Sequence, residues 1–259
     1  MCIGASDVHK RWHVLQGYSV GILKFVGQTF AMPPGDVGNP TSYPFPVLIR
    51  EIRDVPTNPS PPVMLPDGSY SELVQNCIRA AQELEADGVK SIAMWCGFYS
   101  LIQPILAKHV SIPILTSPLI MLPIIHQMMP PEKSVIVVTA AKRLLTFEYF
   151  EAVGADINDR IKVIGLDDAP VFNSFCLVDK PKGQKGVNGF EFNAFRDELC
   201  ELIGKACGPE IGAIMLECTS LPPFAADIHE HTGLPVYDFI ACVEWMHRAI
   251  VPKRYRGYI

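Results

Sequence analysis

The chain has 259 residues, of which 49% are apolar and 19% charged, and its formal net charge is −5. This composition is typical of a compact globular protein with enough apolar residues for a sizeable core, and it excludes an intrinsically disordered chain. The slightly acidic balance without a basic stripe argues against nucleic acid as a partner.

We expect a reducing, cytoplasmic location and no membrane partner. Prolines interrupt the most apolar stretch, residues 112–129, and the first residues lack the apolar run of a secretory signal. Eight cysteines in a chain of this length do not make a disulfide scaffold. No Cys-x-x-Cys is present, which excludes zinc-ribbon and thioredoxin-like sites.

Strands and helices are expected to alternate along the chain. The expected strands are residues 18–25, 47–55, 91–95, 112–116, 134–141, 161–166, 213–216 and 234–238. The expected helices are residues 70–86, 97–109, 142–153, 190–207, a segment opened by the prolines at 222–223, and 239–250. This alternation predicts an α/β protein with a mostly parallel sheet in each of two lobes.

Two long loops separate these elements. Residues 27–46 are rich in Gly and Pro, and we weigh two interpretations: a surface connector, or a lid over a binding site that uses Tyr43 and Phe45. Residues 179–189 are polar and rich in Gly and Lys, which predicts a mobile loop.

A repeated pattern relates the two halves of the chain. Cys96 and Cys218 each end a short apolar strand, and each is followed 17 positions later by a proline that precedes another short strand. Thr116 and Asp238 both fall 20 positions after their cysteine, and by this symmetry we expect Thr116 to bind substrate, whereas Asp238 could also cap the last helix. The repeat predicts two similar lobes, residues 1–128 with 239–259 and residues 129–238, with the two cysteines facing each other between them.

A thiol pair in this position can perform acid–base chemistry. We expect each cysteine to stand where a strand meets a helix N-terminus, which lowers a thiol pKa and attracts a carboxylate. Thr219, Ser220 and the backbone of Gly97 and Phe98 would hold that carboxylate. One thiolate would then take the α-proton, and the opposite thiol would return a proton to the other face. This is racemisation or epimerisation at the α-carbon without a cofactor.

The alternative for either cysteine alone is a small buried hydrophobic residue, which is the commoner case. The matched spacings of the two segments favour the functional interpretation. His229 and His231 lie two positions apart and face different sides of a helix, so no metal site is expected there.

The sequence resembles the aspartate/glutamate racemase superfamily, of the type with two cysteines. The resemblance rests on the strand-end Cys96, the segment Leu-Glu-Cys-Thr-Ser-Leu-Pro-Pro at residues 216–223, Thr139 with Ala140, and the Pro-Gly-Asp-Val-Gly-Asn-Pro loop at 34–40. It implies two pseudo-symmetric α/β lobes with the active site between them. It also implies Cys96 and Cys218 as the acid–base pair, a substrate carboxylate bound by Thr139 and Thr219, and a homo-oligomer.

The sequence departs from the glutamate racemases of that superfamily. Gly97-Phe98 stands where they have Asn-Thr, and Thr219-Ser220 where they have Thr-His, so the groups that recognise an α-amino group are absent or moved. Aromatic residues nearby would suit a cationic substrate. Similar enzymes of the algal dimethylsulfoniopropionate lyase type use the cysteine pair for β-elimination, which makes a lyase the alternative to a racemase. Cys96 argues against a decarboxylase, and the last alternative is a carboxylate-binding protein without catalysis.

Overall fold

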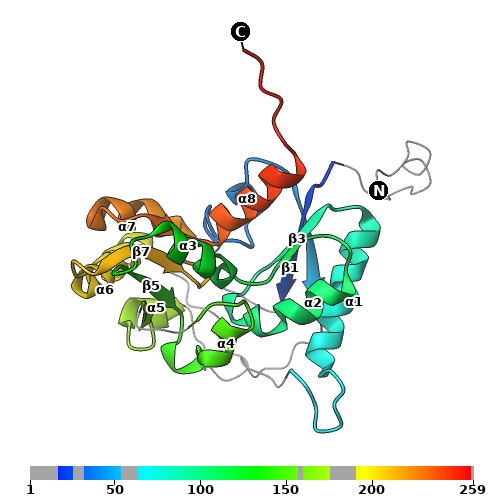
Figure 1. Cartoon of the computed structure of the whole chain (residues 1–259), viewed down its shortest axis with the longest axis horizontal. Helices are drawn as coiled ribbons and strands as arrows, with labels where there is room; N and C mark the ends of the chain where they lie inside the picture. Colours follow the sequence, from blue (N-terminus) through cyan, green and yellow to red (C-terminus); the bar gives the residue numbers. More distant parts are fainter. Residues whose placement is uncertain (1–16, 26–31, 54–62, 157–159, 176–190, 258–259) are drawn as a thin grey trace.

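Two parallel four-stranded sheets organise the computed structural model, which describes residues 17–25, 32–53, 63–156, 160–175 and 191–257 (Figure 1). The strand orders are β2-β1-β3-β4 and β6-β5-β7-β8, so the second sheet repeats the topology of the first. The predicted fold class is therefore confirmed. The strands are β1 (Val20–Phe25), β2 (Val47–Ile52), β3 (Ser91–Met94), β4 (Ile114–Leu115), β5 (Ser134–Thr139), β6 (Ile161–Gly165), β7 (Ile211–Leu216) and β8 (Val236–Tyr237).

Helices cover both faces of both sheets (Figure 1). The α-helices are α1 (Glu72–Asp87), α2 (Gln103–His109), α3 (Leu122–Met128), α4 (Phe147–Glu151), α5 (Pro170–Phe175), α6 (Phe192–Ala206), α7 (Ala225–Thr232) and α8 (Phe239–Ile250). Short 3-10 helices are η2 (Pro40–Ser42), η3 (Gly97–Ile102), η4 (Pro118–Met121), η5 (Lys142–Leu144) and η6 (Pro222–Phe224). None of the helices in the described part is long and apolar enough to cross a bilayer.

The central strands are buried because both of their faces are covered. Every residue of β5 after Ser134 is buried, and so is all of β3. The edge strands β2 and β6 keep partly exposed positions. Continuous apolar runs are typical of parallel strands buried on both faces, which is why these runs were recognisable in the sequence.

The lobes exchange helices across their boundary. Helix α8, which follows the last strand of the second sheet, packs with Phe239, Cys242 and Val243 against β1 and β3 of the first sheet. Reciprocally, η4 and α3, which follow the last strand of the first sheet, place Leu119, Leu122 and Ile125 in the core over β5 and β7. The expected docking of the final helix on the first half is seen. The matching contact of α3, a segment that the sequence analysis assigned to the first lobe, was not expected.

Several boundaries differ from the predicted ones. The helix expected at 142–153 is divided into η5 and α4, because the backbone is extended at Thr146, the N-cap residue of α4. The expected loop at 33–46 contains the short η2, which Asn39 caps by accepting from Thr41 N–H. Residues 54–55 at the end of the strand expected at 47–55, and the whole loop expected at 179–189, lie outside the described residues.

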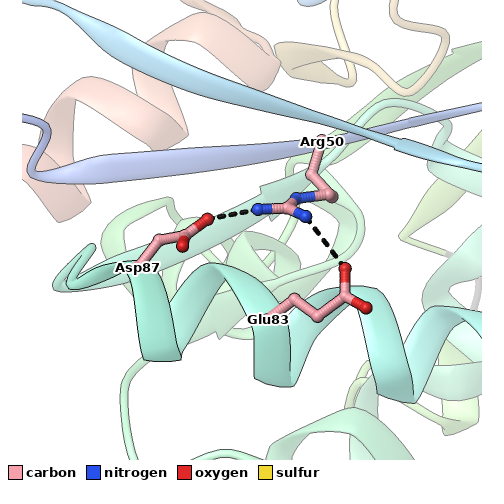
Figure 2. A network of polar contacts seen from close by, with 3 residues as sticks. All are labelled: Arg50, Glu83 and Asp87. Carbon is pink, nitrogen blue, oxygen red and sulfur yellow. Dashed lines mark hydrogen bonds and ion pairs between the residues drawn. The ribbon is translucent and has the colours of Figure 1, made fainter. Parts of the chain in front are cut away.

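An ionic contact ties the edge strand β2 to α1. Figure 2 shows the Arg50 guanidinium between the carboxylates of Glu83, at 2.9 Å, and Asp87. The Arg50 side chain is one-third exposed, so solvent screens these pairs and their contribution is small, about 1 kcal/mol at most for each. Their role is to fix β2 against the helix that covers its sheet.

Candidate active site

Cys96 and Cys218 occupy equivalent places, each two residues beyond the end of the third strand of its sheet order. Both are partly buried thiols and neither forms a disulfide. The expected helix N-terminus is present at Cys96, which is the N-cap residue of η3. The expectation is wrong for Cys218, because Pro222 and Pro223 start η6 later and Leu221 is its N-cap residue.

We call residues 95–97, after β3, and residues 217–220, after β7, the two cysteine turns. They meet at Gly97 and Glu217. A Cβ built on Gly97 would lie 2.2 Å from Glu217 Oε1 and 2.3 Å from the Glu217 carbonyl oxygen. Contacts of that length are not tolerated, so the lobes approach this closely only because residue 97 has no side chain. Each cysteine is the chain neighbour of one residue of this contact, so the backbones that carry the two cysteines come together here.

Glu217 is a fully buried acid at the centre of this contact. Its Oε2 accepts a 2.8 Å hydrogen bond from the Thr139 hydroxyl, and its Oε1 has no hydrogen-bond partner among the described residues. Burial raises the pKa of Glu217 to about 7, although the bond from Thr139 lowers it. A substantial part of the population is therefore protonated at neutral pH, directly before Cys218 in the chain.

A second buried acid, Asp36, connects the same two turns from the loop after β1. Its Oδ1 accepts from Gly38 N–H at 2.7 Å and from Trp95 Nε1 at 2.9 Å. Its Oδ2 accepts from the Ser220 hydroxyl at 3.2 Å. Burial raises the pKa of Asp36 to about 6, against the opposing effect of these donors and of Lys24. Trp95 precedes Cys96, and Ser220 follows Cys218 by two positions.

The residues expected to bind a carboxylate lie around these two acids. The Thr139 hydroxyl donates to Glu217, and the Ser220 hydroxyl donates to Asp36. Thr219 is buried, and its carbonyl oxygen accepts from Val37 N–H at 3.4 Å. Ala140 is buried in the core over one face of the second sheet.

Three other expected site residues have structural contacts of their own. Thr116 is fully buried, and both its N–H and its hydroxyl donate to Gln103 Oε1. Tyr43 lies in the core of the first lobe, and its hydroxyl donates to the Val37 carbonyl at 2.9 Å. Phe98 reaches from the first lobe into the second, where it packs edge-on against Tyr149 with ring centroids 5.8 Å apart.

Comparison of the sequence with known proteins assigns the chain to a family. No family model matches the chain. The chain is 30% identical to "Dimethylsulfoniopropionate lyase" of Durusdinium sp. clade D over 232 residues, which cover 84% of this chain and 70% of that protein. The chain belongs to the dimethylsulfoniopropionate lyase family. A second member, "Dimethylsulfoniopropionate lyase 3" of Emiliania huxleyi, is 27% identical over 88% of this chain but only 58% of its own length.

This chain shares its fold with solved racemases. Allantoin racemase from Klebsiella pneumoniae aligns with a TM-score of 0.58 at 13% identity, covering 90% of this chain and 87% of that one. An aspartate racemase homologue from Pyrococcus horikoshii aligns with a TM-score of 0.52 at 18% identity, over 91% and 98% of the two chains. The predicted resemblance to the racemase superfamily is confirmed for the fold.

In this member of the lyase family, sequence reasoning missed two polar residues of the site, Asp36 and Glu217. Glu217 carried a signal, because an acid directly after a buried apolar strand is unusual without a partner. Asp36 lies between glycines in a proline-rich loop, where an acid is ordinary, and nothing in the sequence indicates its distant partners. Among the described residues, no group of three or more His, Cys, Asp or Glu side chains is arranged to hold a metal.

Proposed function

We propose that the protein is a carbon–sulfur lyase that acts on dimethylsulfoniopropionate or a close β-sulfonio carboxylate. Family membership carries the proposal, and the site supplies a chemical rationale for it. The reaction breaks the bond between the β-carbon and sulfur after a base removes the α-proton. Dimethyl sulfide leaves with the electron pair of that bond, and acrylate remains.

The proposed roles follow from the positions of the residues. Backbone N–H groups of Gly97 and Phe98 would hold the carboxylate together with Thr219, since the first two lie at the start of η3, where amides favour anions. One of the thiols, Cys96 or Cys218, would take the α-proton as its thiolate. In this proposal Thr139 acts indirectly, through Glu217, because its hydroxyl donates to the Glu217 carboxyl group.

A racemase or epimerase is the second candidate, and a specific observation favours it. The two cysteines stand at equivalent strand ends of two sheets with the same strand order. Racemisation needs a proton donor and an acceptor on opposite faces of one carbon, and a symmetric thiol pair would provide both. Elimination needs only one base, so the second thiol has no required proton transfer in a lyase.

Proton NMR in D2O distinguishes the candidates. Dimethylsulfoniopropionate is offered first, followed by aspartate, glutamate and hydantoins as single enantiomers. The lyase predicts new vinyl signals and a dimethyl sulfide methyl signal. Loss of an α-proton signal with the carbon skeleton intact indicates a racemase instead. An unchanged spectrum with every compound contradicts both and favours a carboxylate-binding protein.

The matched control is the protein with serine at both 96 and 218. A serine hydroxyl is a much weaker acid than a thiol, so it forms almost no anion to act as a base at neutral pH. Turnover that persists in this double variant would contradict the two-thiol site, even if the products are those of a lyase.

A further inference from the structure

The loop between β1 and β2 touches both cysteine turns at once. At one end of the contact, Asp36 accepts from Trp95, which is bonded to Cys96 in the chain. At the other end it accepts from Ser220, just after Cys218. Asp36 and Ser220 are 184 residues apart in sequence, so this carboxylate links the two lobes through the turns that carry Cys96 and Cys218.

Residues 35–43 of this loop are held by several contacts, so this part of the loop can transmit a fixed geometry. Gly35 has a φ of +102°, and a Cβ there would lie 2.7 Å from Pro223 Cα, so only glycine fits the approach to the second lobe. The hydroxyl of Ser42 donates to the Asp36 carbonyl at 2.6 Å, and Tyr43 holds the Val37 carbonyl. The Val37 N–H also donates to the Thr219 carbonyl.

The hydrogen bonds of Asp36 are buried, so the loss of any one of them is costly. Asp36 is inaccessible to solvent, and each of its two oxygens accepts from a donor on a different lobe. Water cannot replace a lost donor at such a position without a rearrangement, so the carboxyl group fixes the distance between its two partners. Trp95 is buried in the first-lobe core, and it cannot move independently of the strand that carries Cys96.

We infer that Asp36 is a positioning residue that sets the separation of the Cys96 and Cys218 thiols by holding Trp95 and Ser220 on the two lobes. This inference rests on the proposed active site, in which the turns that carry Cys96 and Cys218 both face the substrate. Asp36 does not touch the reacting atoms; it acts through the two turns. Its contribution is therefore geometric, and an uncharged group of the same shape can supply it.

The test compares Asp36→Ala with Asp36→Asn. Alanine removes all three acceptor contacts. Asparagine keeps an oxygen that can accept from Gly38 and Trp95, and its amide can donate to the Ser220 hydroxyl. The first readout is the rate at which the bifunctional thiol reagent dibromobimane bridges Cys96 and Cys218, with the bridged peptides identified by mass spectrometry. This readout needs no substrate.

The expected result is a bridging rate at least 10-fold lower in Asp36→Ala and within about threefold of wild type in Asp36→Asn. In turnover of dimethylsulfoniopropionate, kcat of the alanine variant should fall about 10- to 100-fold while KM changes little, because misplacement of catalytic groups by an ångström costs up to that factor. Asp67→Ala, in an exposed turn that accepts from Ser69, is the control and should match wild type in both readouts.

Ser220→Ala provides a milder variant that removes only the hydrogen bond to the second lobe, and it carries the test if Asp36→Ala does not fold. It should lower the bridging rate by an intermediate factor. Wild-type rates in both Asp36→Ala and Ser220→Ala overturn the inference. So does an Asp36→Asn variant as slow as the alanine variant, because that result assigns the effect to charge. Absence of any bridge in the wild-type protein contradicts the two-thiol site itself and this inference with it.

Discussion

The two cysteine turns have the same backbone position in their sheets, but their side chains differ. Cys96 lies between Trp95 and Gly97, whereas Cys218 lies between the acid Glu217 and Thr219. In the first-lobe turn, Gly97 has no side chain and leaves room for Glu217. The second-lobe turn provides Glu217 itself, whose carboxyl group occupies that room and accepts from Thr139. A repeated fold thus carries an asymmetric site, so the two thiols have different surroundings.

The largest expected effect comes from replacing each cysteine by serine. Both Cys96→Ser and Cys218→Ser should lower kcat/KM, since a positioned acid or base contributes about 10²- to 10⁴-fold. If the protein is a lyase, the two losses should be unequal, because elimination depends on a single base. Steady-state kinetics with dimethylsulfoniopropionate measures both.

The partly buried Cys200 on α6 offers a control, and Cys200→Ser should retain wild-type kinetics. Equal, large losses in the two site variants would instead indicate that both thiols transfer protons. In that case the two cysteine turns have equivalent functions although different residues flank their cysteines, and the result favours a racemase.

A smaller effect is expected from Glu217→Gln, measured as the pH dependence of unfolding. The pKa of Glu217 is about 7 in the folded protein, against an ordinary value of 4.5, so the folded state binds this proton more tightly than the unfolded state. The free energy of unfolding should therefore fall as pH rises from 4.5 to 7, by about 3 kcal/mol from this group, at about 1.4 kcal/mol per pKa unit.

Urea titrations of both proteins between those pH values check the prediction. The glutamine variant should lose less stability over the range, and the residual slope belongs to Asp36 and Asp238, whose pKa values burial also raises. The exposed Glu230→Gln variant should keep the wild-type slope. A Glu217→Gln slope equal to that of wild type would show that Glu217 is charged in the folded protein at these pH values.

The smallest effects are expected at the equivalent positions Thr116 and Asp238. Asp238 caps α8 by accepting from Ala241 N–H at 2.8 Å, so Asp238→Ala should cost about 1 kcal/mol of stability. Thr116→Val keeps the shape but loses one hydrogen bond to Gln103, at a cost of about 1 kcal/mol. Thermal unfolding measures both.

Turnover of the Thr116→Val variant tests whether this position also binds substrate. Its hydroxyl is occupied by Gln103, so we expect kcat/KM within about threefold of wild type, the range left by a change of under 1 kcal/mol. A loss of more than 10-fold would assign Thr116 to the substrate site, as the sequence symmetry suggested.

The parts of the structure that could be predicted are those that depend on short stretches of the sequence. Buried apolar runs such as β5 and the spacing from each cysteine to its proline were sufficient to predict two similar parallel sheets. The contacts that build the site join residues far apart in the chain, and no periodicity encodes them. Asp36 to Ser220 and Gly97 to Glu217 depend on how the lobes pack, so the sequence indicated the thiols but not the acids beside them.

The exchange of α3 and α8 has a consequence for the order in which the chain folds. The core over one face of the first sheet combines Val20 and Ile22 with Phe239 and Val243, so it cannot close until residues 239–250 have been synthesised. Contacts of such long sequence separation slow folding, and an open apolar face favours aggregation while it waits. The second sheet needs no helix beyond its last strand β8, so its core can close once residue 237 has been synthesised, and α8 follows directly to cover the first sheet.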